Sequence, residues 1–161
     1  MAVFEDPLLA QLAAFLTGIG IPVRRCVLDA TTFLPGIAVS NGALLVDPER
    51  LQWPSDLLHE AGHIAVTAPE DRPTLTVVPD DPGEEMAAIA WSYAAAVEIG
   101  LDARVLFHDG YKGGGASLAE NFTAGRNVGV PMLQWFELTR DARTAEAEGV
   151  PPYPHMQRWL R

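Results

Sequence analysis

Cysteine is nearly absent from this chain. Cys26 is the only one among 161 residues, which excludes a disulfide within the chain and gives no sign of an oxidising compartment. The first six residues include Glu5 and Asp6 but no basic cluster, and no apolar run reaches the roughly 18 residues that a membrane span requires. We therefore expect a cytoplasmic protein with no export signal and no membrane partner.

Basic residues are also scarce. Eleven Lys and Arg residues stand against 21 Asp and Glu residues, which gives a formal net charge of −10. Lys and Arg cluster nowhere, and such an acidic chain repels a phosphate backbone, so nucleic acid is excluded as an expected ligand. The proportions of 48% hydrophobic and 20% charged residues are those of a globular protein. The length predicts one domain over residues 1–161.

The first part of the chain shows helical and then extended patterns. Apolar residues at helical spacing predict an amphipathic helix over residues 6–17. Short apolar segments that follow, with a turn signal at Asn41-Gly42, predict a small antiparallel sheet with a hairpin at that turn. These segments are residues 21–28, 37–39 and 44–46.

The rest of the chain is mainly helical in pattern. Pro54 and Ser55 open a helix that Pro69 limits, and residues 83–100 form a long alanine-rich helix. Residues 75–78 fit either a strand or an extended linker. Further on we expect a strand at 104–108, a glycine-rich loop at 110–115 and helices at 116–124 and 130–139. The predicted class is α+β, with a small sheet beside the helices and a helical C-terminal part.

The motif that carries chemistry is His59-Glu60-Ala61-Gly62-His63. Its two histidines are four residues apart on a predicted helix, so both imidazoles share one face and can bind one tetrahedral metal. Glu60 points to another side, where its carboxylate can take a proton from a water molecule that zinc has made acidic. The sequence therefore predicts a Zn²⁺ site with His59 and His63 as ligands and Glu60 as general base.

A catalytic zinc ion needs a third protein ligand. Val66 and Pro69 stand where the longer metzincin motif requires glycine and histidine. A carboxylate on the next helix is the remaining common solution. Glu84 and Glu85 open that helix, and Glu98 is a rival farther along it. The residue pattern leaves these three alternatives open.

The sequence resembles the short gluzincin-type peptidases, and particularly the ImmA/IrrE-type metallopeptidases. In that family the helix with the two histidines is followed by a helix beginning Glu-Ala-Asn, and here residues 85–90 occupy the corresponding place, with Met86-Ala87 in place of Ala-Asn. The resemblance covers roughly residues 20–97. It implies His59, His63 and Glu85 as zinc ligands, Glu60 as catalytic base, and a small sheet beside the active-site helix.

The glycine-rich segment 108–115 lacks the Gly-Lys-Ser/Thr order of a phosphate-binding loop, so we exclude nucleotide binding there. A lid over the site is one interpretation of the segment, and a plain flexible loop is the other. As a lid, it would bring Tyr111 or His108 near enough to donate a hydrogen bond to the oxyanion of the reaction.

These observations favour a zinc-dependent metallopeptidase that acts on a peptide or protein substrate. The alternative is a non-catalytic, metal-containing binding or regulatory module with a degenerate peptidase fold. A zinc-dependent hydrolase of non-peptide amides would use the same residues. The sequence predicts neither the particular substrate, nor the oligomeric state, nor a role for residues 104–161.

Overall fold

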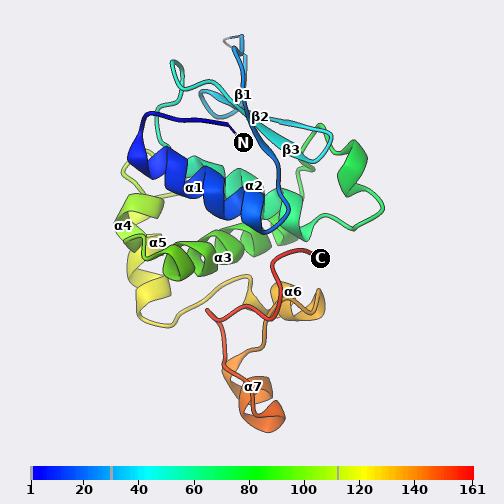
Figure 1. Cartoon of the computed structure of the whole chain (residues 1–161). Coiled ribbons are helices and arrows are strands. Elements are labelled where there is room, and N and C mark those ends of the chain that lie inside the picture. The colour runs from blue at the N-terminus through cyan, green and yellow to red at the C-terminus, as the bar shows by residue number, and fades with distance from the viewer. Residues whose placement is uncertain (1, 30, 112) are drawn as a thin grey trace.

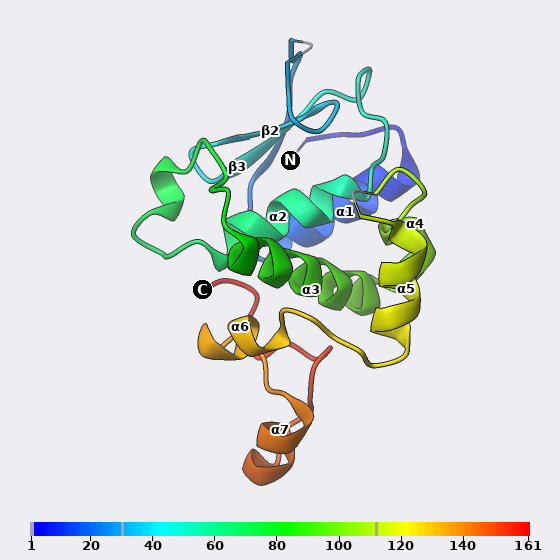
Figure 2. The same cartoon turned by 180° about the vertical axis from the view of Figure 1, so that it is seen from behind.

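The computed structural model describes residues 2–29, 31–111 and 113–161. Met1 and Lys112, which belong to the acidic first segment and the glycine-rich segment considered above, lie outside the described residues, as does Ala30. The sheet lies at one end of the molecule, followed by a layer with the first two helices, then the long third helix, and finally two short C-terminal helices (Figures 1 and 2).

The first helix, α1 (Pro7–Gly18), begins where the sequence predicts. The Asp6 side chain accepts a hydrogen bond of 2.8 Å from the Leu9 backbone N–H, which satisfies one of the free donors at the start of the helix. Its buried face consists of Leu9, Leu12, Ala13 and Leu16. The helix therefore packs through one apolar stripe, as expected from its spacing.

The sheet has three strands, β1 (Val23–Arg25), β2 (Ile37–Ser40) and β3 (Ala43–Val46), in the order β1-β3-β2. The hairpin at Asn41-Gly42 is confirmed, and both turn residues have positive φ, 50° and 74°, as a type I′ turn requires. β1 instead pairs with β3 in parallel, so the sheet is mixed where an antiparallel sheet was expected. The long connection after β1 carries the chain to the far edge, and β3 returns between the other two strands. The α+β class is confirmed.

Two helices, α2 (Asp56–Val66) and α3 (Pro82–Ile99), pack against each other below the sheet. Asp81 begins α3 by accepting hydrogen bonds from the backbone N–H groups of Gly83 and Glu84, and Gly100 ends it at a φ of 74°. A Cβ atom at Gly62 would lie 2.7 Å from the Ala88 carbonyl oxygen. Glycine at this position therefore allows the two helices to approach closely.

The connection between α2 and α3 is irregular except for a short 3-10 helix, η1 (Arg72–Thr74). Residues 75–78 form no strand. The Leu75 carbonyl accepts one hydrogen bond of 3.0 Å from the Gly42 backbone N–H at the hairpin turn. Of the two interpretations offered by the sequence, the extended linker is therefore correct.

The C-terminal part contains α4 (Ala103–Leu106), α5 (Gly115–Thr123), α6 (Val130–Trp135) and α7 (Ala142–Glu148). The strand expected at 104–108 is wrong, because Asp102 caps a helical turn by accepting a hydrogen bond of 2.7 Å from the Arg104 N–H. The helix expected to reach residue 139 ends at Trp135, and Glu137, two residues later, adopts a φ of 61°, which a helix does not allow. Helix α7 was not predicted.

The end of the chain returns to α2 and α3. The indole N–H of Trp91, a fully buried residue of α3, donates a hydrogen bond of 2.9 Å to the Trp159 carbonyl. The Arg161 backbone N–H donates to the Ala65 carbonyl of α2, also at 2.9 Å. The tail thus covers the two central helices. Among residues 2–29, 31–111 and 113–161, no helix is both long and apolar enough to cross a membrane.

Candidate metal centre

Three side chains that the sequence singled out meet between α2 and α3. The Nε2 atoms of His59 and His63 are 3.2 Å apart. Glu85 Oε1 lies 3.1 Å from His59 Nε2, and Glu85 Oε2 lies 2.9 Å from His63 Nε2. Helix α2 supplies the two imidazoles from one face, and the first turn of α3 supplies the carboxylate.

The donor atoms fit a metal ion of the zinc type. Around a tetrahedral zinc ion, donors about 2.0 to 2.1 Å from the metal lie about 3.3 to 3.4 Å from one another. The two Nε2 atoms are 3.2 Å apart, and each lies 3.1 or 2.9 Å from a different oxygen of Glu85, so these separations are close to, but do not form, one such triangle. Two imidazoles and one carboxylate also make up a common donor set of catalytic zinc. The three side chains are thus a group that could hold a metal ion.

Hydrogen bonds also account for these contacts. If both imidazoles carry the proton on Nε2, each donates to its own oxygen of the Glu85 carboxylate, and the two N–H groups lie side by side 3.2 Å apart. If a cation lay among the three donors, the lone pairs of the two Nε2 atoms and of the carboxylate would bind it instead.

The three side chains differ in how exposed they are to solvent. The His63 side chain is 4% exposed, whereas that of Glu85 is 47% exposed. The two imidazoles therefore form the floor of the site, and the carboxylate lies on its solvent side. Hydrogen bonds from His59 and His63 lower the pKa of the Glu85 carboxyl, against the effect of its partial burial. Glu85 is thus a carboxylate at neutral pH.

Glu60 lies beside the three donors. Burial raises the pKa of its carboxyl, the neighbouring His59 and His63 oppose that rise, and Glu85 adds to it. These influences place Glu60 within electrostatic reach of the whole donor group. No hydrogen bond within the described part of the chain engages its carboxylate, so Glu60 has free acceptor oxygens next to the metal donors.

Of the two residues considered for the oxyanion, Tyr111 reaches the site. Its hydroxyl lies 2.9 Å from His59 Nδ1, the imidazole nitrogen that faces away from Glu85. Burial, and then the carboxylates of Glu85, Asp56 and Glu60, raise the pKa of the Tyr111 phenol. Tyr111 is therefore an uncharged hydroxyl, which can both donate and accept a hydrogen bond.

His108 is engaged elsewhere. Its Nε2 atom lies 2.7 Å from Asp56 Oδ1, and its ring stacks on that of Trp53 with centroids 4.1 Å apart. Sequence reasoning missed both partners. Asp56 stands three residues before His59, a spacing that puts both side chains on one side of α2, and this was the signal that could have found it. His108 thus holds its loop on the helix that carries the histidines.

The rival third ligands do not join the donors. Among the described residues, the group of potential ligand side chains that converges contains His59, His63 and Glu85, without Glu84 or Glu98. Glu98 is exposed near the opposite end of α3, and its supposed partner Asp102 instead caps α4. Glu84 has intermediate burial, as Glu85 has, and its backbone N–H donates to the Asp81 cap.

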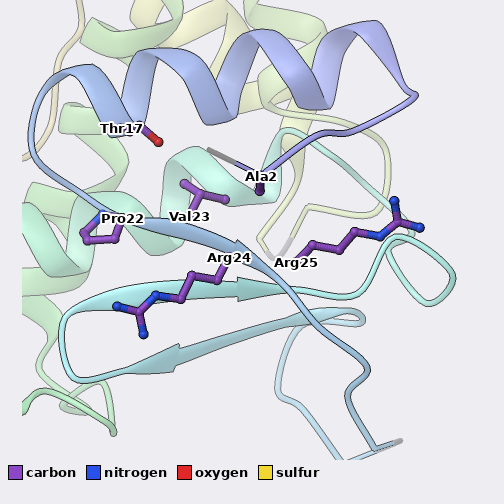
Figure 3. A pocket seen from close by; sticks show the side chains of 6 residues that line it. All are labelled: Ala2, Thr17, Pro22, Val23, Arg24 and Arg25. Atoms are coloured by element: carbon purple, nitrogen blue, oxygen red, sulfur yellow. The ribbon is translucent and has the colours of Figure 1, made fainter.

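Two surface pockets of about 400 Å³ each add nothing to this site. One lies between the end of α1 and β1, where the side chains of Arg24 and Arg25 extend in different directions rather than forming a cationic cluster (Figure 3). The other is lined by Pro131, Gln134, Trp135 and Glu137. Neither is lined by a metal-donor residue.

Comparisons with protein-family models, with curated proteins and with solved structures gave no match for this chain.

Proposed function

We propose that this protein is a zinc-dependent metallopeptidase-like hydrolase of the short gluzincin type, related to the ImmA/IrrE-type peptidases. The observation that carries the proposal is the convergence of His59 Nε2, His63 Nε2 and the Glu85 carboxylate, with Glu60 unengaged beside them. Two imidazoles and one carboxylate leave a fourth position for water, as catalytic zinc sites do. A purely structural site would fill that position with a fourth protein ligand.

The proposed chemistry assigns a role to each residue. His59, His63 and Glu85 would hold the ion. A bound zinc ion would supply Lewis acidity, which lowers the pKa of a water molecule so that it can lose a proton at neutral pH and act as a nucleophile towards a carbonyl carbon. Glu60 takes the proton from that water as it attacks and gives the proton to the leaving amine when the C–N bond breaks. One carboxylate therefore both accepts the proton and returns it, and Glu60 is ionised again at the end of the reaction.

Tyr111 remains the better of the two proposed donors to the carbonyl oxygen as that atom gains negative charge, but its hydroxyl lies on His59 Nδ1, away from the metal donors, and would have to leave that position to reach the oxygen. It is the group from the glycine-rich segment that contacts a metal donor. His108 was the other candidate, but its Nε2 atom is paired with Asp56. The proposed role of His108 is therefore to fix the loop that carries Tyr111.

The proposal includes a peptide or protein substrate and a cytoplasmic location. The single cysteine supports a reducing compartment, and the net charge of −10 argues against a nucleic-acid ligand.

The test is Glu60→Gln in zinc-loaded protein. The substitution removes the proton acceptor but keeps the shape of the side chain and all three metal donors. We expect zinc affinity to stay within about twofold and cleavage of a defined peptide mixture, followed by mass spectrometry, to fall by about 10²- to 10⁴-fold.

Glu98→Gln is the matched control, because it removes the same charge from an exposed position near the far end of α3. This control should leave both zinc affinity and cleavage unchanged. Cleavage by Glu60→Gln at the parent rate would show that Glu60 is not the base. A zinc-loaded parent that leaves every peptide intact would count against hydrolysis of peptides altogether.

A further inference from the structure

The contact between Tyr111 and His59 is made at Nδ1, the nitrogen of the ring that does not face the other metal donors. The Tyr111 hydroxyl faces Nδ1, while the Nε2 atom of the same ring faces Glu85 and His63. A neutral imidazole carries its proton on one nitrogen only. The group that binds Nδ1 therefore controls whether Nε2 presents a lone pair or a proton to the other donors.

For a metal, only one of the two tautomers of His59 is useful. Nε2 must offer its lone pair, so Nδ1 must carry the proton and donate it to an acceptor. Metal-binding histidines commonly donate this proton to a carboxylate, a backbone carbonyl or water. Here the partner of Nδ1 is the Tyr111 oxygen at 2.9 Å, and Tyr111 comes from a loop 52 residues farther along the chain.

The loop is built to keep this oxygen in place. Asp56, one turn before His59 on α2, lies 2.7 Å from His108 Nε2. The Trp53 ring stacks on the His108 ring, with centroids 4.1 Å apart. The Tyr111 ring also packs edge-on against Phe107, with centroids 5.2 Å apart. The Tyr111 ring is thus held by Phe107 and by a loop that Asp56 and Trp53 fix at His108.

A close backbone approach closes the loop. A Cβ atom at Gly115 would lie 2.2 Å from the His108 carbonyl oxygen, so only glycine lets the chain return this near to its own start. The Tyr111 N–H donates to the same His108 carbonyl at 3.0 Å. The position of the Tyr111 hydroxyl is therefore set by the loop itself as well as by its side-chain contacts.

We propose that Tyr111 is a positioning residue for the metal centre: its hydroxyl oxygen accepts the Nδ1 proton of His59 and so fixes the tautomer and ring orientation in which Nε2 can bind the ion. This inference rests on the proposed zinc site. It assigns to Tyr111 an effect on metal affinity in the absence of any substrate. A role at the oxyanion alone predicts no such effect.

The experiment measures zinc affinity without substrate, by competition with a chromophoric chelator, for the parent and for Tyr111→Phe. The variant keeps the ring that packs on Phe107 and loses only the hydroxyl. We expect zinc to bind about 10- to 100-fold more weakly, the usual effect of removing the partner of a metal-bound histidine.

Tyr93→Phe is the matched control. Tyr93 belongs to the same aromatic cluster, with its ring 5.0 Å from that of Phe122, and within the described residues its hydroxyl makes no hydrogen bond. The zinc affinity of Tyr93→Phe should equal that of the parent. Equal zinc affinity of Tyr111→Phe and the parent would overturn the inference and leave the proposed function standing. A parent that binds no zinc would overturn both.

A second measurement does not depend on the folding of the variant. Nitrogen-15 NMR of the zinc-loaded parent should show His59 protonated at Nδ1, with a proton that exchanges slowly with solvent because Tyr111 accepts it. An unprotonated Nδ1, or a proton that exchanges as fast as that of an exposed imidazole, would overturn the inference.

Discussion

At the scale of single residues, Glu85 links the two histidines through one carboxylate. Each of its oxygens faces a different imidazole, at 3.1 and 2.9 Å. The carboxylate is about half exposed, whereas the His63 side chain beneath it is 4% exposed. A metal ion or water molecule would therefore reach the donors from the side of Glu85. Glu85 is therefore the proposed ligand most open to solvent.

Glu85→Gln tests this ligand against its neighbour Glu84→Gln. Both variants remove one negative charge from the first turn of α3, so their effects on the helix dipole are alike. We expect Glu85→Gln to lose more zinc affinity than the about 10- to 100-fold that an outer partner contributes. Glu84→Gln should bind zinc as the parent does. Isothermal titration with zinc would show the difference, and equal affinities in the two variants would remove Glu85 from the ligand set.

The sequence predicted some residues of the site and not others for a physical reason. The spacing of His59 and His63 is local, and helical geometry alone puts them on one face. The third ligand remained one of three glutamates until the packing of α3 was known. The contacts of Tyr111 with His59 and of His108 with Asp56 each span 52 residues, and they join α2 to a loop whose path no local pattern describes.

At the scale of elements, the close approach of α2 and α3 depends on small residues. Gly62 lies inside the histidine motif and faces the backbone of Ala88. Because glycine has no side chain, the two helices approach each other closely at this point. Any wider spacing would move Glu85 away from the imidazoles. The helix interface and the geometry of the donors are therefore set by the same pair of positions.

Gly62→Ala should destabilise the protein, although alanine normally stabilises a helix relative to glycine. The new Cβ atom would lie 2.7 Å from the Ala88 carbonyl oxygen, and overpacking of this kind costs about 1 to 3 kcal/mol. Gly18→Ala, at the end of α1 with no atom within 4 Å of the new Cβ, should instead gain about 0.5 to 1 kcal/mol. Urea unfolding gives both free energies, and effects of the same sign would contradict the packing argument.

Local signals also decided which elements were predicted correctly. The hairpin at Asn41-Gly42 follows from the backbone preference of two adjacent residues, and it is confirmed. The parallel pairing of β1 with β3 depends on where the chain goes between the strands, which periodicity does not encode. The error at 104–108 arose because apolar residues were given more weight than the Asp102 cap.

At the scale of the whole molecule, two arginines close the C-terminal end of α2. The last carbonyls of a helix lack partners within it. Arg72 donates to the carbonyls of Ile64 and Thr67, and Arg161 donates to those of Ala65 and Val66. Arg72 also donates to the main-chain oxygen of Arg161. Helix α2 thus ends on the connection to α3 and on the tail.

Arg72→Met should lower the free energy of unfolding by about 1.5 to 3 kcal/mol, the usual contribution of hydrogen bonds from a charged group. Arg50→Met is the control: the Arg50 side chain is 47% exposed and, within the described residues, its ion pair is the one with Asp47 at 3.6 Å, so its loss should cost less than about 1 kcal/mol. Thermal unfolding followed by circular dichroism measures both. Equal losses would show that the carbonyls at the end of α2 do not depend on Arg72.

The return of the tail to α2 has a consequence for biosynthesis. The ribosome releases both histidines and Glu85 long before Trp159 and Arg161, which cover α3 and complete the end of α2. The nascent chain therefore carries all three proposed metal donors while the helices that hold them are still uncovered. The contacts of Trp159 with α3 and of Arg161 with α2 form only after these two residues have been synthesised.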